Sequence, residues 1–227
     1  MIVAERKNFD EIAEATEGFE KILVLGCGTC VAVCMAGGER EVGLLASELR
    51  MTGKMADKLV KIDEATIQRQ CDTEFFESIL AKADEYDLIL SMACGAGVQM
   101  AADLLSPKIV VPGLNTRFIG VTESEGEWSE KCLACGDCKL GSYGGICPVT
   151  RCTKSLLNGP CGGAKLGKCE AADGRDCAWN LIYERLKAQD RLDLLRREPV
   201  LKDNAKKGHP QRQSAEVPVE EQEPVTS

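Results

Sequence analysis

The sequence predicts an α/β fold in which a parallel-sheet domain is followed by a small cysteine-rich, metal-organised lobe and a C-terminal helix. Over the first half of the chain, short apolar runs alternate with segments of helical spacing, as in βαβ units. Eight cysteines then crowd residues 131–177, where little periodicity remains. Helical spacing returns after this segment, through Trp179, Ile182, Leu186 and Leu192.

The predicted sheet begins with KILVLG (21–26), a continuous apolar run typical of a strand buried on both faces. Because strands and helices alternate, we expect a Rossmann-like domain over residues 1–125. Further strands are predicted at 58–63, 87–92, 108–113 and 118–123, and helices at 8–20, 31–55, 73–85 and 94–105.

Composition divides the rest of the chain into three parts. Residues 126–178 form the cysteine-rich lobe, which we expect to lack a core of its own and to be organised by its metal ligands. Residues 179–201 are predicted to be a C-terminal helix. Residues 202–227 have almost no large apolar side chains, so we expect a disordered tail. The only histidine, His209, lies in that tail, which excludes a Ser/His/Asp triad.

Charge and hydropathy narrow the classes of function. The net charge of -8 argues against non-specific nucleic-acid binding, which requires clustered Lys and Arg. No apolar run reaches the roughly 18 residues needed to span a bilayer, and the N-terminus has no apolar signal-peptide core. We therefore expect a cytoplasmic protein without direct membrane insertion.

The chain contains 13 cysteines, far more than a cytoplasmic protein of 227 residues usually carries. A reducing compartment keeps thiols from pairing, so this density indicates metal ligation rather than a disulfide framework. The chemistry expected of the chain is therefore that of its metals.

The first cysteine cluster follows the first predicted strand. Cys27, Cys30 and Cys34 occupy the place where a Rossmann domain has its phosphate loop, and Gly26 and Gly28 permit a tight turn there. The third glycine of the dinucleotide fingerprint is absent, which makes nucleotide binding the weaker reading. Thiolates at this spacing can instead hold three irons of a [4Fe–4S] cluster.

A fourth thiolate for this cluster has two candidates, Cys94 and Cys71. Cys94 directly follows the third predicted strand, and in a doubly wound sheet the first and third strands are neighbours, so Cys94 is favoured. Cys71 also follows a strand, at a longer distance. One of the two is expected to be only a small buried side chain, as free cysteines often are.

The second cysteine cluster is a partial ferredoxin pattern. Cys132, Cys135 and Cys138 have the C-x2-C-x2-C spacing. Cys147, which directly precedes Pro148, follows after a gap of eight residues, where the ferredoxin pattern has three. The remaining cysteines of the lobe are Cys152, Cys161, Cys169 and Cys177. Eight thiolates suffice for two clusters. We expect Cys132, Cys135 and Cys138 to share one cluster with a more distant cysteine, and the remaining cysteines to hold the other. Zinc is the alternative, since four-cysteine zinc sites also use C-x2-C pairs.

These motifs together resemble the MetV family, the small iron–sulfur subunits of acetogen-type methylenetetrahydrofolate reductase. The resemblance covers about residues 20–197, and the sequence is also similar to a C-terminal domain of such reductases. Its strings are VLGCGTCVAVCMAGGEREV, RQCD, SMACGAGVQ, PGLNT, KCLACGDC, GGICPVTRCTKSLLNGPCGG and DCAWNLIYERL.

The resemblance implies a non-catalytic subunit of an oxidoreductase in one-carbon metabolism, in the methyl branch of the Wood–Ljungdahl pathway. Such a subunit relays electrons from ferredoxin or an associated electron-transfer module to the flavin of a MetF-type partner, which reduces methylene- to methyl-tetrahydrofolate. The resemblance implies Cys27, Cys30, Cys34 and the C-terminal cysteines as metal ligands. From the cysteine pattern we expect two or three [4Fe–4S] clusters, with zinc possible at one site. The alternative is a zinc-binding scaffold that docks the same kind of partner without passing electrons.

Overall fold

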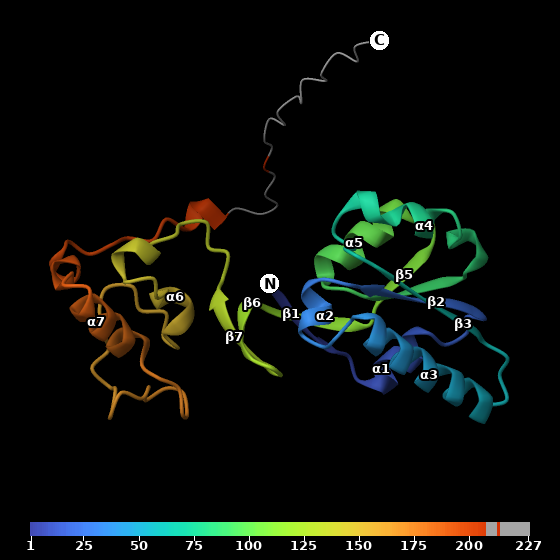
Figure 1. The fold of residues 1–227 in the computed structure, drawn as a ribbon, viewed down its shortest axis with the longest axis horizontal. Coiled ribbons are helices and arrows are strands. Elements are labelled where there is room, and N and C mark those ends of the chain that lie inside the picture. The colour runs from blue at the N-terminus through green and yellow to red at the C-terminus, as the bar shows by residue number, and fades with distance from the viewer. Residues whose placement is uncertain (208–212, 214–227) are drawn as a thin grey trace, which may run out of the picture.

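The computed structural model describes residues 1–207 and Gln213. It is a mixed α/β protein with a four-stranded parallel sheet and a separate three-stranded antiparallel sheet (Figure 1). No helix in the described part of the chain has the length and apolar character needed to span a bilayer. His209 and the predicted tail beyond Lys207, except Gln213, lie outside the described residues.

The elements of the sheet domain are β1 (Ile2–Arg6), α1 (Phe9–Ala15), β2 (Lys21–Cys27), α2 (Cys30–Val33), α3 (Glu39–Met55), β3 (Lys61–Ile67), α4 (Glu77–Leu80), β4 (Leu88–Met92), α5 (Gly95–Leu104), β5 (Ile109–Pro112), β6 (Leu114–Ser124) and β7 (Glu127–Cys132). The cysteine lobe contains α6 (Pro148–Arg151) and α7 (Ala178–Ala188). Short 3-10 turns are Thr73–Phe76, Ala83–Glu85, Leu140–Ser142, Leu192–Arg196 and Asn204–Lys207.

The parallel sheet has the strand order β3-β2-β4-β5, and helices cover both of its faces (Figure 1). Side chains of β2 alternate between the two layers, as a pleated strand requires. Val24 packs with Leu45 of α3 on one face, whereas Leu25 packs with Ile79 of α4 on the other. The apolar run 21–26 is therefore a central strand, as predicted.

The predicted adjacency of the first and third strands is confirmed, because β2 pairs with β3 on one side and with β4 on the other. After β2 the chain forms β3 on one side of this strand, and then forms β4 on the opposite side of it. The carboxyl ends of β2 and β4 lie next to each other at this reversal, where ligands bind in open α/β sheets.

The antiparallel sheet, with order β1-β6-β7, differs from the sequence prediction. The segment 118–123 was expected in the parallel sheet, but it belongs to β6, which pairs with β1 and β7. Strand β1 was not predicted, because its five residues show neither a long apolar run nor clean alternation. The β6–β7 hairpin connects the sheet domain to the cysteine lobe (Figure 1).

Several predicted elements have different limits in the structure. The helix expected over 73–85 is reduced to α4 between two 3-10 turns, and the C-terminal helix expected over 179–201 ends at Ala188, with a separate 3-10 turn at Leu192–Arg196. The helix expected over 31–55 is broken into α2 and α3, since Met35 adopts a positive φ of 54° and Gly38 caps a new helix. The strand expected at 58–63 runs instead over Lys61–Ile67. This shift brings the end of β3 closer to Cys71.

The cysteine lobe has a small apolar core, contrary to the expectation that it would have none. Tyr143 and Ile146 come from the cysteine-rich segment and pack with Trp179 and Ile182 of α7. The rings of Tyr143 and Trp179 meet edge to face with centroids 5.7 Å apart, and the Trp179 indole N–H donates to Leu156 O at 3.0 Å. Helix α7 therefore supplies much of the apolar surface on which the cysteine loops rest.

Candidate metal centres

Three cysteines meet at the carboxyl ends of the parallel strands. Cys27 ends β2, Cys94 directly follows β4 and precedes α5, and Cys71 lies in the loop after β3. Burial is the main cause that raises the pKa of the Cys71 thiol, and the neighbouring Cys94 and Cys27 thiols raise it further. The structure thus brings both Cys71 and Cys94 to this edge of the sheet, although the sequence alone indicates them as alternative ligands.

Gln70 holds the loop that carries Cys71. Its side chain is completely buried, and its amide nitrogen donates to Leu25 O at 2.8 Å and to Gly26 O at 3.0 Å. Its amide oxygen accepts from the Ser91 hydroxyl at 2.7 Å. Since these partners belong to β2 and β4, Gln70 fixes Cys71 beside Cys27 and Cys94.

Gly97 lets helix α5 approach this loop. A Cβ at position 97 would lie 2.9 Å from the Gln70 Cβ and 2.8 Å from the Ala93 Cβ, closer than real Cβ contacts. Only glycine therefore allows the start of α5, with Cys94 before it, to pack against the residue that precedes Cys71.

Cys30 and Cys34 lie one helical turn apart at the two ends of α2, but their environments differ. Cys34 is buried against β1, where it accepts from Ala4 N–H at 3.5 Å and donates to Ala4 O at 3.6 Å. Burial raises the pKa of the Cys34 thiol. Cys30 is half-buried, and the described contacts do not engage its sulfur in a comparable backbone pair. Its thiol is the more available of the two.

The glycines predicted to shape this loop have different surroundings. Gly26 lies inside β2, where a Cβ would be only 2.5 Å from Thr66 Oγ1 and 2.7 Å from Val42 Cγ2. Gly28 follows the strand, and its N–H donates to Ile67 O at 2.9 Å. Gly26 thus serves close packing between β2, β3 and α3, and a cofactor-binding role for either glycine stays a prediction.

A second group of cysteines surrounds one cavity in the C-terminal lobe. Cys132, Cys135, Cys138 and Cys147 all line a space of about 300 Å³. The sequence left the fourth partner of the C-x2-C-x2-C triplet open, and the structure places Cys147 beside it. In bacterial ferredoxins the corresponding C-P cysteine often ligates a different cluster, so this arrangement departs from that pattern.

Backbone amides face the sulfurs of this group. Ala134 N–H donates to Cys132 Sγ at 3.3 Å, and Thr150 N–H donates to Cys147 Sγ at 3.5 Å. Such hydrogen bonds stabilise negative charge on a sulfur, and they are one means by which proteins tune cluster potentials. The donor set and the cavity fit a [4Fe–4S] group.

The last four cysteines lie on adjoining loops. Cys169 and Cys177 share a small hairpin, in which Cys169 N–H donates to Arg175 O at 2.9 Å and Cys177 N–H donates to Gly167 O at 2.8 Å. The backbone N–H of Ala171 is the main cause that lowers the pKa of the Cys169 thiol.

Contacts link this hairpin to the loops of the other two cysteines. Cys169 Sγ lies 3.7 Å from the hydroxyl of Thr153, the residue after Cys152, and Cys161 Sγ lies 3.5 Å from Glu170 Oε1. Gly163 N–H also donates to Cys161 Sγ at 3.4 Å. The loops that carry Cys152, Cys161 and Cys169 are therefore in contact, and Cys177 belongs to the same hairpin as Cys169.

Zinc and a [4Fe–4S] cluster differ in the distance that they require between four cysteine sulfurs. Four sulfurs around zinc at 2.3 Å lie about 3.8 Å from one another in tetrahedral geometry. In the described residues, no group of three or more His, Cys, Asp or Glu side chains is close enough to hold one metal ion. The sulfurs of a cubane lie further apart, because four irons and four sulfides stand between them.

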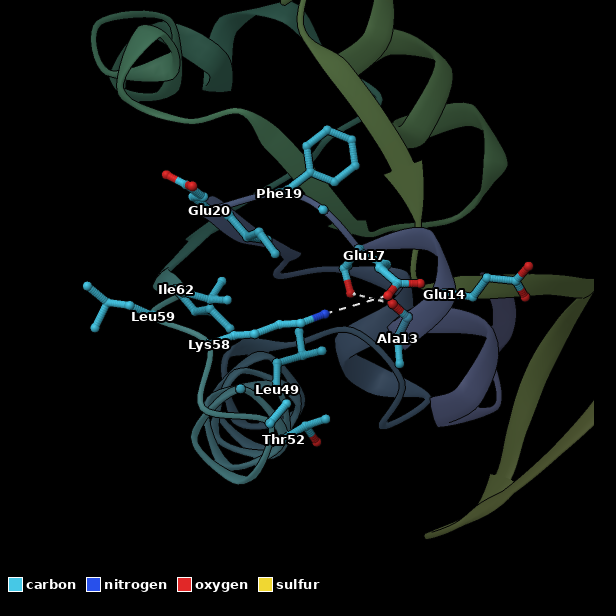
Figure 2. Close-up of a pocket in the computed structure, with 16 residues that line it drawn as sticks. Ala13, Glu14, Glu17, Phe19, Glu20, Leu49, Thr52, Lys58, Leu59 and Ile62 are labelled. Atoms are coloured by element: carbon cyan, nitrogen blue, oxygen red, sulfur yellow. Dashed lines mark hydrogen bonds and ion pairs between the residues drawn. The ribbon is translucent and has the colours of Figure 1, made fainter.

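A separate groove of about 600 Å³ lies at the other end of the parallel sheet, where β2 and β3 begin. Figure 2 shows Lys58 reaching toward Glu17, and their charged atoms are 3.5 Å apart. Phe19 and Leu59 add apolar surface. The described residues that line it include no cysteine, so it is not a candidate metal centre.

Comparison with protein families places the C-terminal part of the chain. Residues 111–205 match the family described as "Methylene-tetrahydrofolate reductase C terminal". The match supports a protein related to methylenetetrahydrofolate reductase. It includes eight of the 13 cysteines and indicates an association with a reductase system of this kind. No curated protein and no solved structure matches the chain.

Proposed function

We propose that this chain is the MetV-type electron-transfer subunit of a methylenetetrahydrofolate reductase complex. One observation carries the proposal: Cys132, Cys135, Cys138 and Cys147 line a single cavity, with backbone N–H groups directed at two of the sulfurs. Four convergent thiols of ferredoxin-like spacing are the donor set of a [4Fe–4S] cluster. The family match over residues 111–205 supports the association with the reductase.

Twelve of the cysteines divide into three sets of four in this proposal. The first contains Cys27, Cys30, Cys71 and Cys94; the second contains Cys132, Cys135, Cys138 and Cys147; the third contains Cys152, Cys161, Cys169 and Cys177. Cys34 is left as a buried thiol of the fold, because backbone groups of Ala4 in β1 and of Val31 in α2 engage its sulfur. This departs from the ligand set that the family resemblance implies.

Each cluster would carry one electron at a time, whereas reduction of methylene- to methyl-tetrahydrofolate requires two. A flavin on the MetF-type partner would collect the two electrons and deliver a hydride. The residues of this chain hold, bury and hydrogen-bond the clusters and so set their potentials. The chain offers no histidine in its described residues for acid–base work, and the chemical step belongs to the partner.

The decisive experiment measures iron, acid-labile sulfide and zinc in anaerobically purified protein, together with electron paramagnetic resonance after reduction. We expect iron and sulfide well in excess of zinc. The variants Cys135→Ser and Cys94→Ser should each lose iron and slow reduction of the partner's flavin. Cys34→Ser is the matched control and should retain full iron content. Iron-free protein that still supports turnover of the partner would refute the proposal.

Zinc at one of the three sites is the second candidate, and the third set is the place for it. Its hairpin loops and N–H···S contacts also suit a structural metal. One zinc per chain that disappears in Cys169→Ser, with iron unchanged, would assign zinc to this set.

A further inference from the structure

The two parts of the chain carry opposite charge. Residues 1–130 contain 12 Lys and Arg against 23 Asp and Glu, a net charge of −11. Residues 131–177 contain seven Lys and Arg against four Asp and Glu, a net charge of +3 before any thiol ionises. Because a [4Fe–4S] cluster on four thiolates is itself negatively charged, the lobe's attraction for an acidic partner depends on where its lysines lie rather than on its net charge, whereas the sheet domain repels such a partner.

The positive charge is concentrated at the cavity of the second cysteine set. Lys131, Lys139 and Lys202 line it, and Lys131 is also paired with Glu123 of β6. Asp137 is the one carboxylate among the described lining residues, and its side chain is only 8% exposed. Lys139 and Lys206 lie 3.0 and 3.1 Å from that carboxylate, and their hydrogen bonds hold the Asp137 pKa below its ordinary value. The negative charge is thus covered by ammonium groups.

The same mouth presents apolar and sulfur atoms to solvent. Leu133 and Leu140 are 40% and 37% exposed, and both line the cavity. Cys132 and Cys138 are exposed as well, so one edge of a group held there would lie near the surface. Electron transfer between proteins requires a short distance between redox centres and a small contact area that allows rapid dissociation.

We propose that this lysine-rimmed mouth is the docking surface for an acidic one-electron carrier protein. The inference rests on the proposed function, because it takes the second cysteine set to hold a cluster. Carboxylates of the carrier approach Lys131, Lys139 and Lys202, and Leu133 and Leu140 contact its apolar surface. The carrier's redox centre loses one electron and the cluster gains it, with no bond formed or broken.

The test is anaerobic stopped-flow mixing of the full chain with a reduced acidic ferredoxin, followed by cluster absorbance. The variant Lys139→Glu/Lys202→Glu should react about tenfold more slowly than the parent at low ionic strength. At about 0.5 M salt the two rates should converge, because the Debye length falls below the charge separation. Lys54→Glu/Lys58→Glu is the matched control, since it makes the same charge change on the sheet domain.

The outcomes separate this inference from the proposed function. Dithionite, a small reductant, should reduce the clusters of all three proteins at similar rates. Protein without a reducible cluster would contradict the proposed function itself. Clusters that dithionite reduces normally, combined with equal ferredoxin rates in the two charge variants, would overturn only the docking surface. A parent rate that does not depend on salt would overturn it too.

Discussion

The buried amide of Gln70 provides the sharpest test of how the sheet domain forms its thiol site. Gln70→Leu removes three hydrogen bonds, two to strand carbonyls of β2 and one from the Ser91 hydroxyl, at a fully buried position. Each bond contributes about 1 kcal/mol net, and carbonyls left without a partner add to the loss. We expect the free energy of unfolding to fall by about 3–5 kcal/mol.

Urea denaturation of the reduced, metal-free full chain, followed by far-ultraviolet circular dichroism, measures this loss. With an m value near 2 kcal/mol per molar, the midpoint should move down by about 1.5–2.5 M. Gln99→Leu is the control, because Gln99 is exposed on α5 and donates only to Gly95 O; its change should stay within about 0.5 kcal/mol.

A double-mutant cycle isolates the link to β4. Gln70→Leu with Ser91→Ala should lose about 1 kcal/mol less than the sum of the single variants, since both partners are then apolar. In metal-loaded protein, Gln70→Leu should lose iron from the first set only, because Cys71 is no longer held beside Cys27. A loss of stability no larger than that of Gln99→Leu would show that this reasoning is wrong.

Three further outcomes are expected from other parts of the molecule. Ile182→Ala, at a completely buried position in the lobe core, should destabilise the lobe by about 2–5 kcal/mol, measured from Trp179 fluorescence during denaturation. Removing metal with a chelator should shift Trp179 emission to the red while most of the helical dichroism of the sheet domain remains, because Trp179 adjoins Cys177 in that core. Burial, followed by its bond to Asp63, raises the pKa of Tyr86 to about 12. The unfolded chain releases this proton near pH 10, so stability should fall as pH rises from about 10 to 12, and Tyr86→Phe should reduce that slope in denaturation curves.

The sequence predicts the centre of the fold better than its edges. The run 21–26 becomes a central strand buried on both faces, and continuous apolar character is sufficient to identify such a strand. Strand β3 is an edge strand with exposed charged residues, and its true limits were therefore missed. Strand β1 is stabilised by pairing with β6, more than 100 residues away, and local periodicity cannot report that pairing.

The same difference between local patterns and long-range contacts explains which features of the thiol sites the sequence predicts. The spacing of Cys132, Cys135 and Cys138 is local, so the sequence predicts that they act together. Cys71 depends on where β3 ends and on Gln70, whose partners lie in other strands. The residues around Cys71 reveal neither the true end of β3 nor the strand partners of Gln70. The sequence could therefore name Cys71 and Cys94 as alternatives but could not show that both reach the same edge of the sheet.

The position of Cys34 bears on the whole assignment of ligands. Strand β1 is an edge strand, and the N–H and C=O groups of Ala4 point away from β6 toward the Cys34 sulfur. If Cys34 bound a cluster as a thiolate, it could no longer donate to Ala4 O, and a buried carbonyl would lose a partner at a cost of about 1–3 kcal/mol. A first set that uses Cys30 and Cys71 instead avoids this loss. The odd number of cysteines is then explained by packing, since the thirteenth thiol satisfies the free edge of β1.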